Sequence, residues 1–240
     1  MQDEYAHISE YRTWNDVYIN IASIICALIR IHPGPTKWQE GLTDRLIDSD
    51  WRTLKSPSGT PWGDKFTLRN YTIVRWDMDN RRGGGTAIII HKSIEYDIIT
   101  TPHLLRAEAC TIRLKLINRP VTLASVWNPP EDLEITDVDS LLQLTPTVIA
   151  AGDWNAKNQI WNCRTNTKAG RKLQNHWITS GNFEILAPDS PTYIPNAINK
   201  QPDILDITLD KNLSYTIKIT IINELSSDHL PVKLEIALAP

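Results

Sequence analysis

Short apolar runs rich in β-branched residues alternate with turn-forming residues along the chain from Phe66 onward. Such runs, bounded by turn signals, are typical of β-strands. We therefore predict about seven strands in this part of the chain. They cover residues 71–74, 86–90, 121–126, 147–151, 204–209, 217–222 and 231–236.

Two segments among these strands favour helices. Residues 137–144 have Asp139 in the first turn, and residues 169–180 end just before Gly181, a residue suited to a helix C-cap. Because strands outnumber helices, the pattern indicates an α/β (α+β) protein with helices laid over sheets.

The longest apolar run, residues 17–31, is too short to cross a bilayer and is interrupted by polar residues. It follows acidic residues rather than a basic leader, so we expect neither a signal peptide nor a transmembrane segment. A buried helix is our prediction for this run.

The first quarter of the chain specifies little structure. Clusters of Pro, Gly and Ser at residues 32–35 and 56–61 interrupt both the helical and the strand periodicity of apolar residues, and they mark loops or linkers. The pattern therefore predicts one domain over residues 64–240, preceded by a poorly specified segment over residues 1–63.

Composition excludes few functions. A hydrophobic content of 41% and a charged content of 22% are ordinary for a globular protein. With a net charge of −3, the chain has no global basic field, so any nucleic-acid binding must be local. Three scattered cysteines without a CxxC pair argue against a disulfide framework or a zinc site and favour a reducing intracellular compartment.

The segment most informative about chemistry follows the predicted strand at 147–151, where the chain reads Gly-Asp-Trp-Asn. Asp153 and Asn155 are two apart, so on an extended backbone they point the same way and can together hold a metal ion, a water and a phosphate oxygen. Gly152 gives room for a close backbone approach. The alternative is a loop in which these side chains only make local turns.

Two further segments place ionisable groups at strands. Asp228 and His229 precede the last predicted strand, where the histidine can neutralise or protonate a phosphate oxygen, although such a pair can also be incidental. Asp206 lies inside an apolar strand, where a carboxylate needs a partner and a histidine is a natural one. Together the three segments suit hydrolysis of a phosphodiester with a hard cation.

Six short motifs occur in an order that resembles the endonuclease/exonuclease/phosphatase superfamily, and within it the endonuclease domains of jockey-like non-LTR retrotransposons. The match covers roughly residues 64–236. The motifs are GGGTAI (83–88), VWNPP (126–130), GDWNAK (152–157), SPTY (190–193), PDILDITL (202–209) and SSDHLPV (226–232).

This resemblance implies a four-layer sandwich of two β-sheets flanked by helices. It implies dependence on Mg²⁺, with Mn²⁺ as a substitute, and no small-molecule cofactor. The implied activity is nicking of target DNA, which leaves a 3′ hydroxyl to prime reverse transcription. A reverse transcriptase domain in the parent element and a nuclear site of action follow as expectations, and no membrane partner is expected.

The resemblance also assigns roles to residues. Asp153 would activate the attacking water and contribute to metal binding, and Asn155 would contact the phosphate. Asp228 would serve the metal or the water. His229 would bind the scissile phosphate and Asp206 would orient it.

Further substrate contacts are expected around this set. Asp203 is the second choice for the residue that orients the histidine. The family usually has tyrosine where Trp127 stands, so the ring is kept and a hydroxyl is lost, for which Asn128 is expected to compensate in part. Tyr193 would stack or wedge at the cut site.

Basic residues offer local phosphate contacts at Arg81, Arg82, Lys157, Arg171 and Lys172. The alternative for each of them is a solvated surface.

A larger departure lies upstream, where the family carries a metal-binding glutamate. The corresponding residues 55–63 contain no acid, and an asparagine of the family's site has only a faint counterpart in Trp14-Asn15. Loss of one carboxylate would weaken Mg²⁺ binding, so a decayed or mis-joined element copy is one hypothesis. The alternatives are a catalytically dead, vestigial DNA-binding fold and an apurinic-site nuclease or phosphatase of the same superfamily.

Overall fold

The computed structural model describes the chain in several stretches, and the account that follows is confined to them. They are residues 18–20, 24–25, 71–77, 85–92, 94–115, 120–213, 216–221, 228–230 and 232–237.

The centre of the fold is a six-stranded sheet in the order β5-β6-β7-β8-β10-β9. Neighbouring strands are antiparallel except β7 and β8, which are parallel. A parallel pair needs a crossover, and α2 supplies it between these two strands. The strands are β5 (Tyr96–Ile98), β6 (Glu108–Leu114), β7 (Val121–Trp127), β8 (Val148–Asp153), β9 (Glu184–Leu186) and β10 (Asp206–Lys211).

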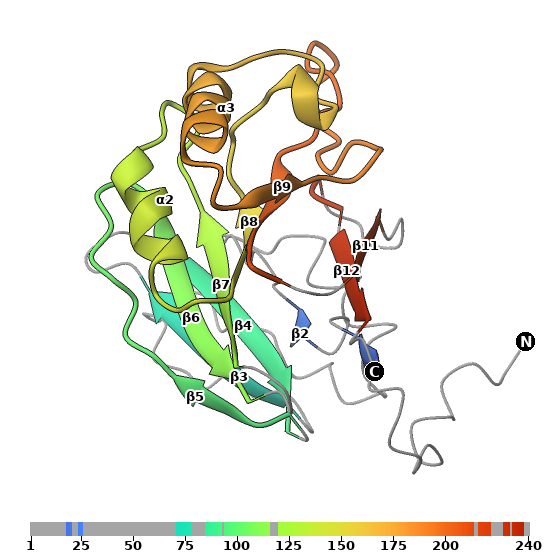
Figure 1. Ribbon diagram of the computed structural model, residues 1–240. Coiled ribbons are helices and arrows are strands. Elements are labelled where there is room, and N and C mark those ends of the chain that lie inside the picture. The colour runs from blue at the N-terminus through green and yellow to red at the C-terminus, as the bar shows by residue number, and fades with distance from the viewer. Residues whose placement is uncertain are drawn as a thin grey trace, which may run out of the picture.

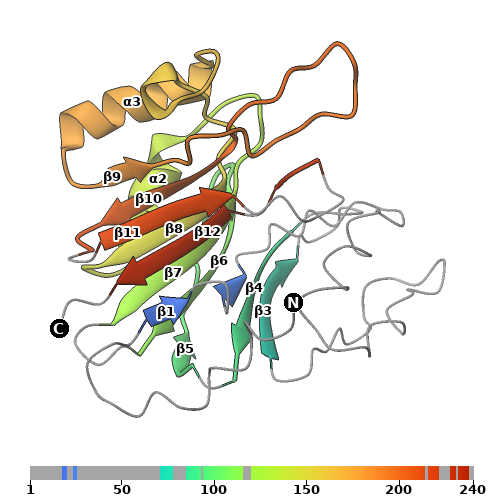
Figure 2. The same cartoon turned by 90° about the vertical axis from the view of Figure 1, so that its right-hand side faces the viewer.

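Two three-stranded sheets cover one face of this central sheet (Figure 2). Ile88 and Leu234, one from each small sheet, share an apolar core with Ile149 of the central sheet. The first small sheet contains β2 (Ile24–Ile25), β4 (Gly85–His91) and β3 (Tyr71–Asp77), and the second contains β1 (Tyr18–Asn20), β12 (Val232–Ala237) and β11 (Thr216–Ile221).

The helices α2 (Ile135–Leu142) and α3 (Lys168–Ser180) lie over the other face of the central sheet (Figure 1). The Thr167 side chain caps α3 by accepting a hydrogen bond from the Gly170 N–H, and Gly181 ends the helix with a left-handed φ of 58°. Leu141 and Leu173 are fully buried in the core beneath these helices. A short 3-10 turn, η3 (Gln159–Trp161), precedes α3.

The architecture confirms the predicted α/β sandwich, and the described residues show three of its four layers. All seven predicted strands are present within a few residues of their expected bounds. The helix α2 begins at Ile135, so Asp137 rather than Asp139 lies in its first turn.

The prediction of a buried helix over residues 17–31 is wrong. This run contains β1 and β2, which pair with β12 and β4 respectively. A continuous apolar run fits a buried helix and a buried strand equally well, and here pairing with distant strands decides the outcome. Within the described residues, no helix is both long and apolar enough to cross a membrane.

Candidate active site

The site begins where β7 and β8 end side by side. Gly152 has a φ of 151°, and a Cβ atom on it would lie 2.0 Å from the Val126 carbonyl oxygen. Only glycine allows this close approach. The approach places Asp153 beside Trp127, its partner in the parallel ladder, at the carboxyl end of both strands.

Two carboxylates meet across the next strand pair. Asp153 is the last residue of β8, and it lies opposite Asp206, the first residue of β10. Both are buried, with exposed fractions of 3% and 8%. Two buried carboxylates in this position need a positive partner.

His229 supplies such a partner. Its Nδ1 atom lies 3.1 Å from Asp206 Oδ2, which is hydrogen-bond distance. Of the two carboxylates considered for orienting this histidine, the structure places Asp206 against the ring. The orienting role itself stays a prediction.

A short segment of chain holds the histidine beside Asp206. The Thr192 hydroxyl accepts hydrogen bonds from the Leu205 and Asp206 N–H groups, and the Thr192 carbonyl accepts one from Leu230 at 2.7 Å. Thr192 is fully buried, so it links the strands on either side of the Asp206 and His229 pair. The SPTY motif was recognised in the sequence, but no role was predicted for Thr192. Hydrogen bonds to backbone groups of distant segments leave no local pattern in a sequence.

Tyr193 lies next to the histidine. The two ring centroids are 4.9 Å apart with the planes tilted by 52°. The backbone of Tyr193 forms isolated bridges with both Asp203 and His229, so its position is set from two sides. Tyr193 is thus at the site, where stacking on a substrate stays a prediction.

Asp203 lies away from the histidine partner position and serves a local structural role. Its carboxylate accepts hydrogen bonds from the Arg164 and Ile204 N–H groups, and it forms an ion pair with Lys157 at 3.1 Å. The side chain is buried, and the described contacts of Lys157 are directed to it rather than to solvent. These contacts argue that Asp203 stabilises the segment between β8 and α3, to which Lys157 and Arg164 belong.

Asn128 is fully buried, which argues against the substrate contact expected of it. Its Nδ2 atom, which carries two hydrogens, lies within hydrogen-bond distance of the carbonyl oxygens of Pro129, Asp132 and Trp154, at 2.9, 2.9 and 3.1 Å. Asn155, in contrast, is only partly buried, and its Nδ2 donates to the Asn128 carbonyl at 2.9 Å.

The remaining predicted residues fall in different places. Asp228 is exposed beside His229, and Trp127 is partly buried. Among the basic candidates, Lys172 contacts Asp132 and Arg171 donates to the Asn166 carbonyl. Outside the described residues lie Arg81, Arg82, Trp14, Asn15 and the acid-free stretch 55–63.

The environment shifts two pKa values in ways that suit the site. Burial, and next the charge of Asp206, raise the pKa of Asp153 to about 7. Burial disfavours the charged form of His229, but the hydrogen bond and charge of Asp206, with Asp153 and Asp228, outweigh it and raise its pKa to about 9. At neutral pH the site therefore holds a positively charged His229 ring next to Asp206.

A divalent cation fits the carboxylates of this site when waters and a substrate phosphate supply its other ligands. Within the parts of the chain that the structure describes, no group of three or more His, Cys, Asp or Glu side chains could hold a metal ion. Proteins commonly bind Mg²⁺ with one or two carboxylates, while waters and substrate phosphates complete its coordination. Asp153 at the end of β8 and Asp228, exposed next to His229, carry carboxylate oxygens of the kind that Mg²⁺ takes as ligands.

The chain is similar to known proteins of mobile elements. A family model described as endonuclease-reverse transcriptase matches residues 121–233. The chain is 30% identical over 152 residues to a probable RNA-directed DNA polymerase from transposon X-element of Drosophila melanogaster, a match that covers 62% of this chain and 17% of that protein. It is 29% identical over 205 residues to the RNA-directed DNA polymerase from mobile element jockey of the same species, covering 83% and 22% respectively.

A solved structure shows the same fold. The endonuclease domain of TRAS1, a telomere-specific non-LTR retrotransposon, superposes with a TM-score of 0.58 at 16% identity, covering 72% of this chain and 81% of that one. Residues 121–233, just under half of the chain, are thus similar to the endonuclease-reverse transcriptase family. The chain spans about a fifth of the length of the two polymerases.

Proposed function

We propose that this domain cuts one strand of DNA by hydrolysing a phosphodiester with the help of Mg²⁺, which Mn²⁺ can replace. In this proposal the cut leaves a 3′ hydroxyl that primes reverse transcription by a polymerase domain of the same element, in the nucleus. The observation that carries it is the meeting of Asp153, Asp206 and His229 at the carboxyl end of β8. The similarity to endonuclease-reverse transcriptase proteins supports the substrate class.

Each residue has a role that its surroundings suit. Asp153, with a pKa near neutrality, would accept the proton of the attacking water. The imidazolium of His229 would neutralise charge on a phosphate oxygen, with Asp206 holding the ring by its Nδ1 atom. Asn155 would donate a hydrogen bond to the phosphate.

A bound Mg²⁺ would supply further charge neutralisation on phosphate oxygens, held by Asp153 and Asp228. Tyr193 beside the His229 ring would contact the nucleotide at the cut, and Trp127, next to Asp153, would line the same position. Asp203 and Asn128 are left out of substrate contact because both are buried, and the Asp203 carboxylate and the Asn128 Nδ2 atom bond within the protein.

The test is nicking of a supercoiled plasmid with Mg²⁺, with Mn²⁺ and with EDTA. Asp153→Ala and His229→Ala should each abolish nicking, as should EDTA. Asp210→Asn is the matched control, because Asp210 is buried at the far end of the same strand as Asp206 and should leave nicking intact.

Failure of the folded parent to nick at any metal concentration would contradict the proposal and favour the vestigial fold. Cutting confined to a plasmid that carries apurinic sites would favour the repair-type alternative.

A further inference from the structure

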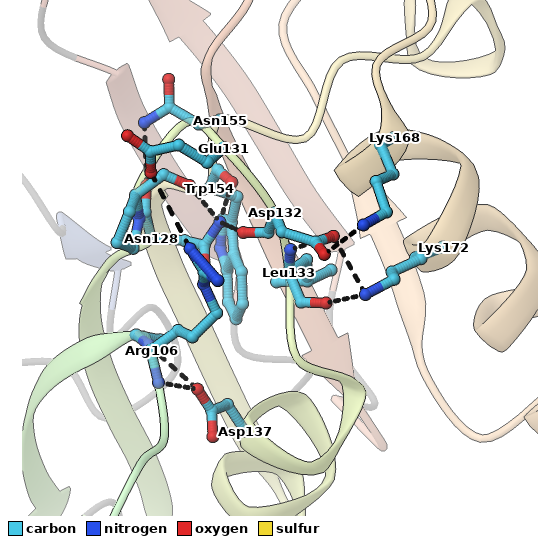
Figure 3. Close-up of polar contacts among 12 residues, drawn as sticks. Arg106, Asn128, Glu131, Asp132, Leu133, Asp137, Trp154, Asn155, Lys168 and Lys172 are labelled. Carbon is cyan, nitrogen blue, oxygen red and sulfur yellow. Dashed lines mark hydrogen bonds and ion pairs between the residues drawn. The ribbon is translucent and has the colours of Figure 1, made fainter.

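The peptide group between Trp154 and Asn155 is held at both ends by side chains. Its carbonyl oxygen accepts a hydrogen bond from Asn128 Nδ2 at 3.1 Å, and its N–H donates to Asp153 Oδ1 at 3.0 Å. Figure 3 shows Asn128, Trp154 and Asn155 together at the end of β8. The orientation of this peptide group sets the direction in which the Asn155 side chain leaves the backbone.

That orientation is an unusual one for a residue with a side chain. Asn155 has a φ of 48°, in the left-handed region that few residues other than glycine occupy, although asparagine tolerates it better than most. Such a conformation persists when the surrounding contacts hold it in place. Here the holding contacts come from Asn128 and Asp153.

Asn128 also holds the side chain of Asn155. Its carbonyl oxygen accepts a hydrogen bond from Asn155 Nδ2 at 2.9 Å, while its own N–H donates to the Asp153 carbonyl at 2.8 Å. A side-chain amide has two donor hydrogens. With one of them directed to Asn128, the second can point to a phosphate oxygen.

The Asn128 side chain fixes the turn that carries this carbonyl. It is fully buried, and its amide spans Pro129 and Asp132 on one side and Trp154 on the other. Removing that amide would release both the turn after β7 and the Trp154 carbonyl at once.

We propose that Asn128 is a positioning residue that aims the amide of Asn155 at the phosphate. The use of the amide in catalysis rests on the proposed function, but the positioning itself does not. The first test therefore reads the position of Asn155 without any reaction.

In that test, NMR measures exchange of the Asn155 side-chain amide hydrogens with water, the signals being assigned with Asn155→Ala. Asn128→Ala should speed the exchange by about tenfold, as expected for loss of roughly one hydrogen bond. Asn158→Ala is the matched control, because Asn158 is equally buried and bonds Gly170 and Gln174 instead, so exchange should not change. Unchanged exchange in Asn128→Ala would overturn the proposal.

If the alanine variant does not fold, Asn128→Ser keeps one donor and leaves a smaller cavity. It should give a smaller rise in exchange, and no rise would again overturn the proposal.

The second test is a double-mutant cycle on nicking with Asn128→Ala, Asn155→Ala and the double variant. Asn128→Ala should lower kcat with little change in KM, and it should add nothing once Asn155 is gone. If the losses in kcat of the two single variants multiply in the double variant, Asn128 acts independently of Asn155, and the proposal is overturned. Absence of nicking in the parent would count against the proposed function alone, because the exchange measurement decides the positioning.

Discussion

Asp206 Oδ2 and His229 Nδ1 lie 3.1 Å apart, although β10, which contains Asp206, and β12, which follows His229, belong to different sheets. Asp206 begins β10 of the central sheet, and His229 precedes β12 of a smaller one. The contact therefore ties the two layers together at the site and holds a positive charge beside Asp153.

We predict that Asp206→Asn lowers the pKa of His229 from about 9 towards its ordinary value of 6.5. Burial would still disfavour the imidazolium once the charged partner is removed. NMR titration of the histidine ring in EDTA measures this shift. A pKa that stays near 9 would show that Asp206 is not the main partner.

The same shift has a consequence for stability. Because the pKa of His229 is higher in the folded state than in the unfolded state, protonated His229 stabilises the fold. This contribution is fully present below about pH 6.5 and is lost as the pH rises through about 9. Asp206→Asn should flatten the decline in the free energy of unfolding over that range.

Asp210, a second carboxylate on β10, should destabilise the fold at neutral pH. Burial, reinforced by the charge of Glu184 and partly offset by the Leu213 N–H, raises the pKa of Asp210 to about 6. The folded state then holds a proton more tightly than the unfolded state, so stability increases as pH falls from about 6 towards 4. Asp210→Asn should stabilise the protein at pH 7 by about 1–3 kcal/mol and remove this increase.

Urea unfolding at pH 4, 5, 6 and 7 measures the effect. Glu184→Gln is a useful companion, because it removes only the charge opposite Asp210 and should give a smaller gain. A loss of stability at pH 7 in Asp210→Asn would contradict the prediction.

Local patterns predicted the strands that carry the site, since β7, β8 and β10 are apolar and bounded by turn residues. They did not predict β6, whose Glu108 and Arg113 interrupt its apolar character, or β5 and β9, which have three residues each. These strands are stabilised by pairing with distant neighbours, which no short window of sequence records.

The site was predictable in its residue types and not in its contacts. Asp153 and Asp206 face each other because of the register between β8 and β10, and neither residue's neighbours in sequence specify that register. The burial of Asn128 depends on backbone carbonyl groups from separate segments, and the linking role of Thr192 depends on backbone N–H groups from separate segments. Motifs identify which side chains are present, whereas packing decides which of them can reach a substrate.

Gly152 and Gly181 make a matched pair for testing the close approach at the site. A Cβ on Gly152 would meet the Val126 backbone at 2.0 Å, whereas a Cβ on Gly181 would meet nothing within 4 Å, and both residues have positive φ. Gly152→Ala should cost at least about 3 kcal/mol, because it adds a backbone clash to the strain. Gly181→Ala should cost about 1 kcal/mol for the strain alone. Similar costs in urea unfolding would show that β7 yields to the added methyl group.

The loop after β7 is tied to α3 by two lysines that should differ in importance (Figure 3). Lys168 is largely exposed and contacts Asp132 at 2.7 Å, so a charge at this position is screened by solvent. Lys172 is less exposed, and it contacts Asp132 at 2.9 Å and the Leu133 carbonyl at 3.0 Å. Hydrogen bonds from Lys168 and Lys172 hold the pKa of Asp132 well below its usual range.

We expect Lys172→Met to lower Tm by about 2–4 °C and Lys168→Met by about 1 °C or less, as measured by thermal unfolding. The effect of Lys168→Met should vanish in high salt, while that of Lys172→Met should persist in part because its bond to the Leu133 carbonyl is less dependent on screening. A larger loss for Lys168→Met would mean that the charge pair, rather than the bond to the backbone, fastens this loop to the helix. Since the same loop begins at Asn128, Lys172→Met should also speed exchange of the Asn155 amide, by less than Asn128→Ala does.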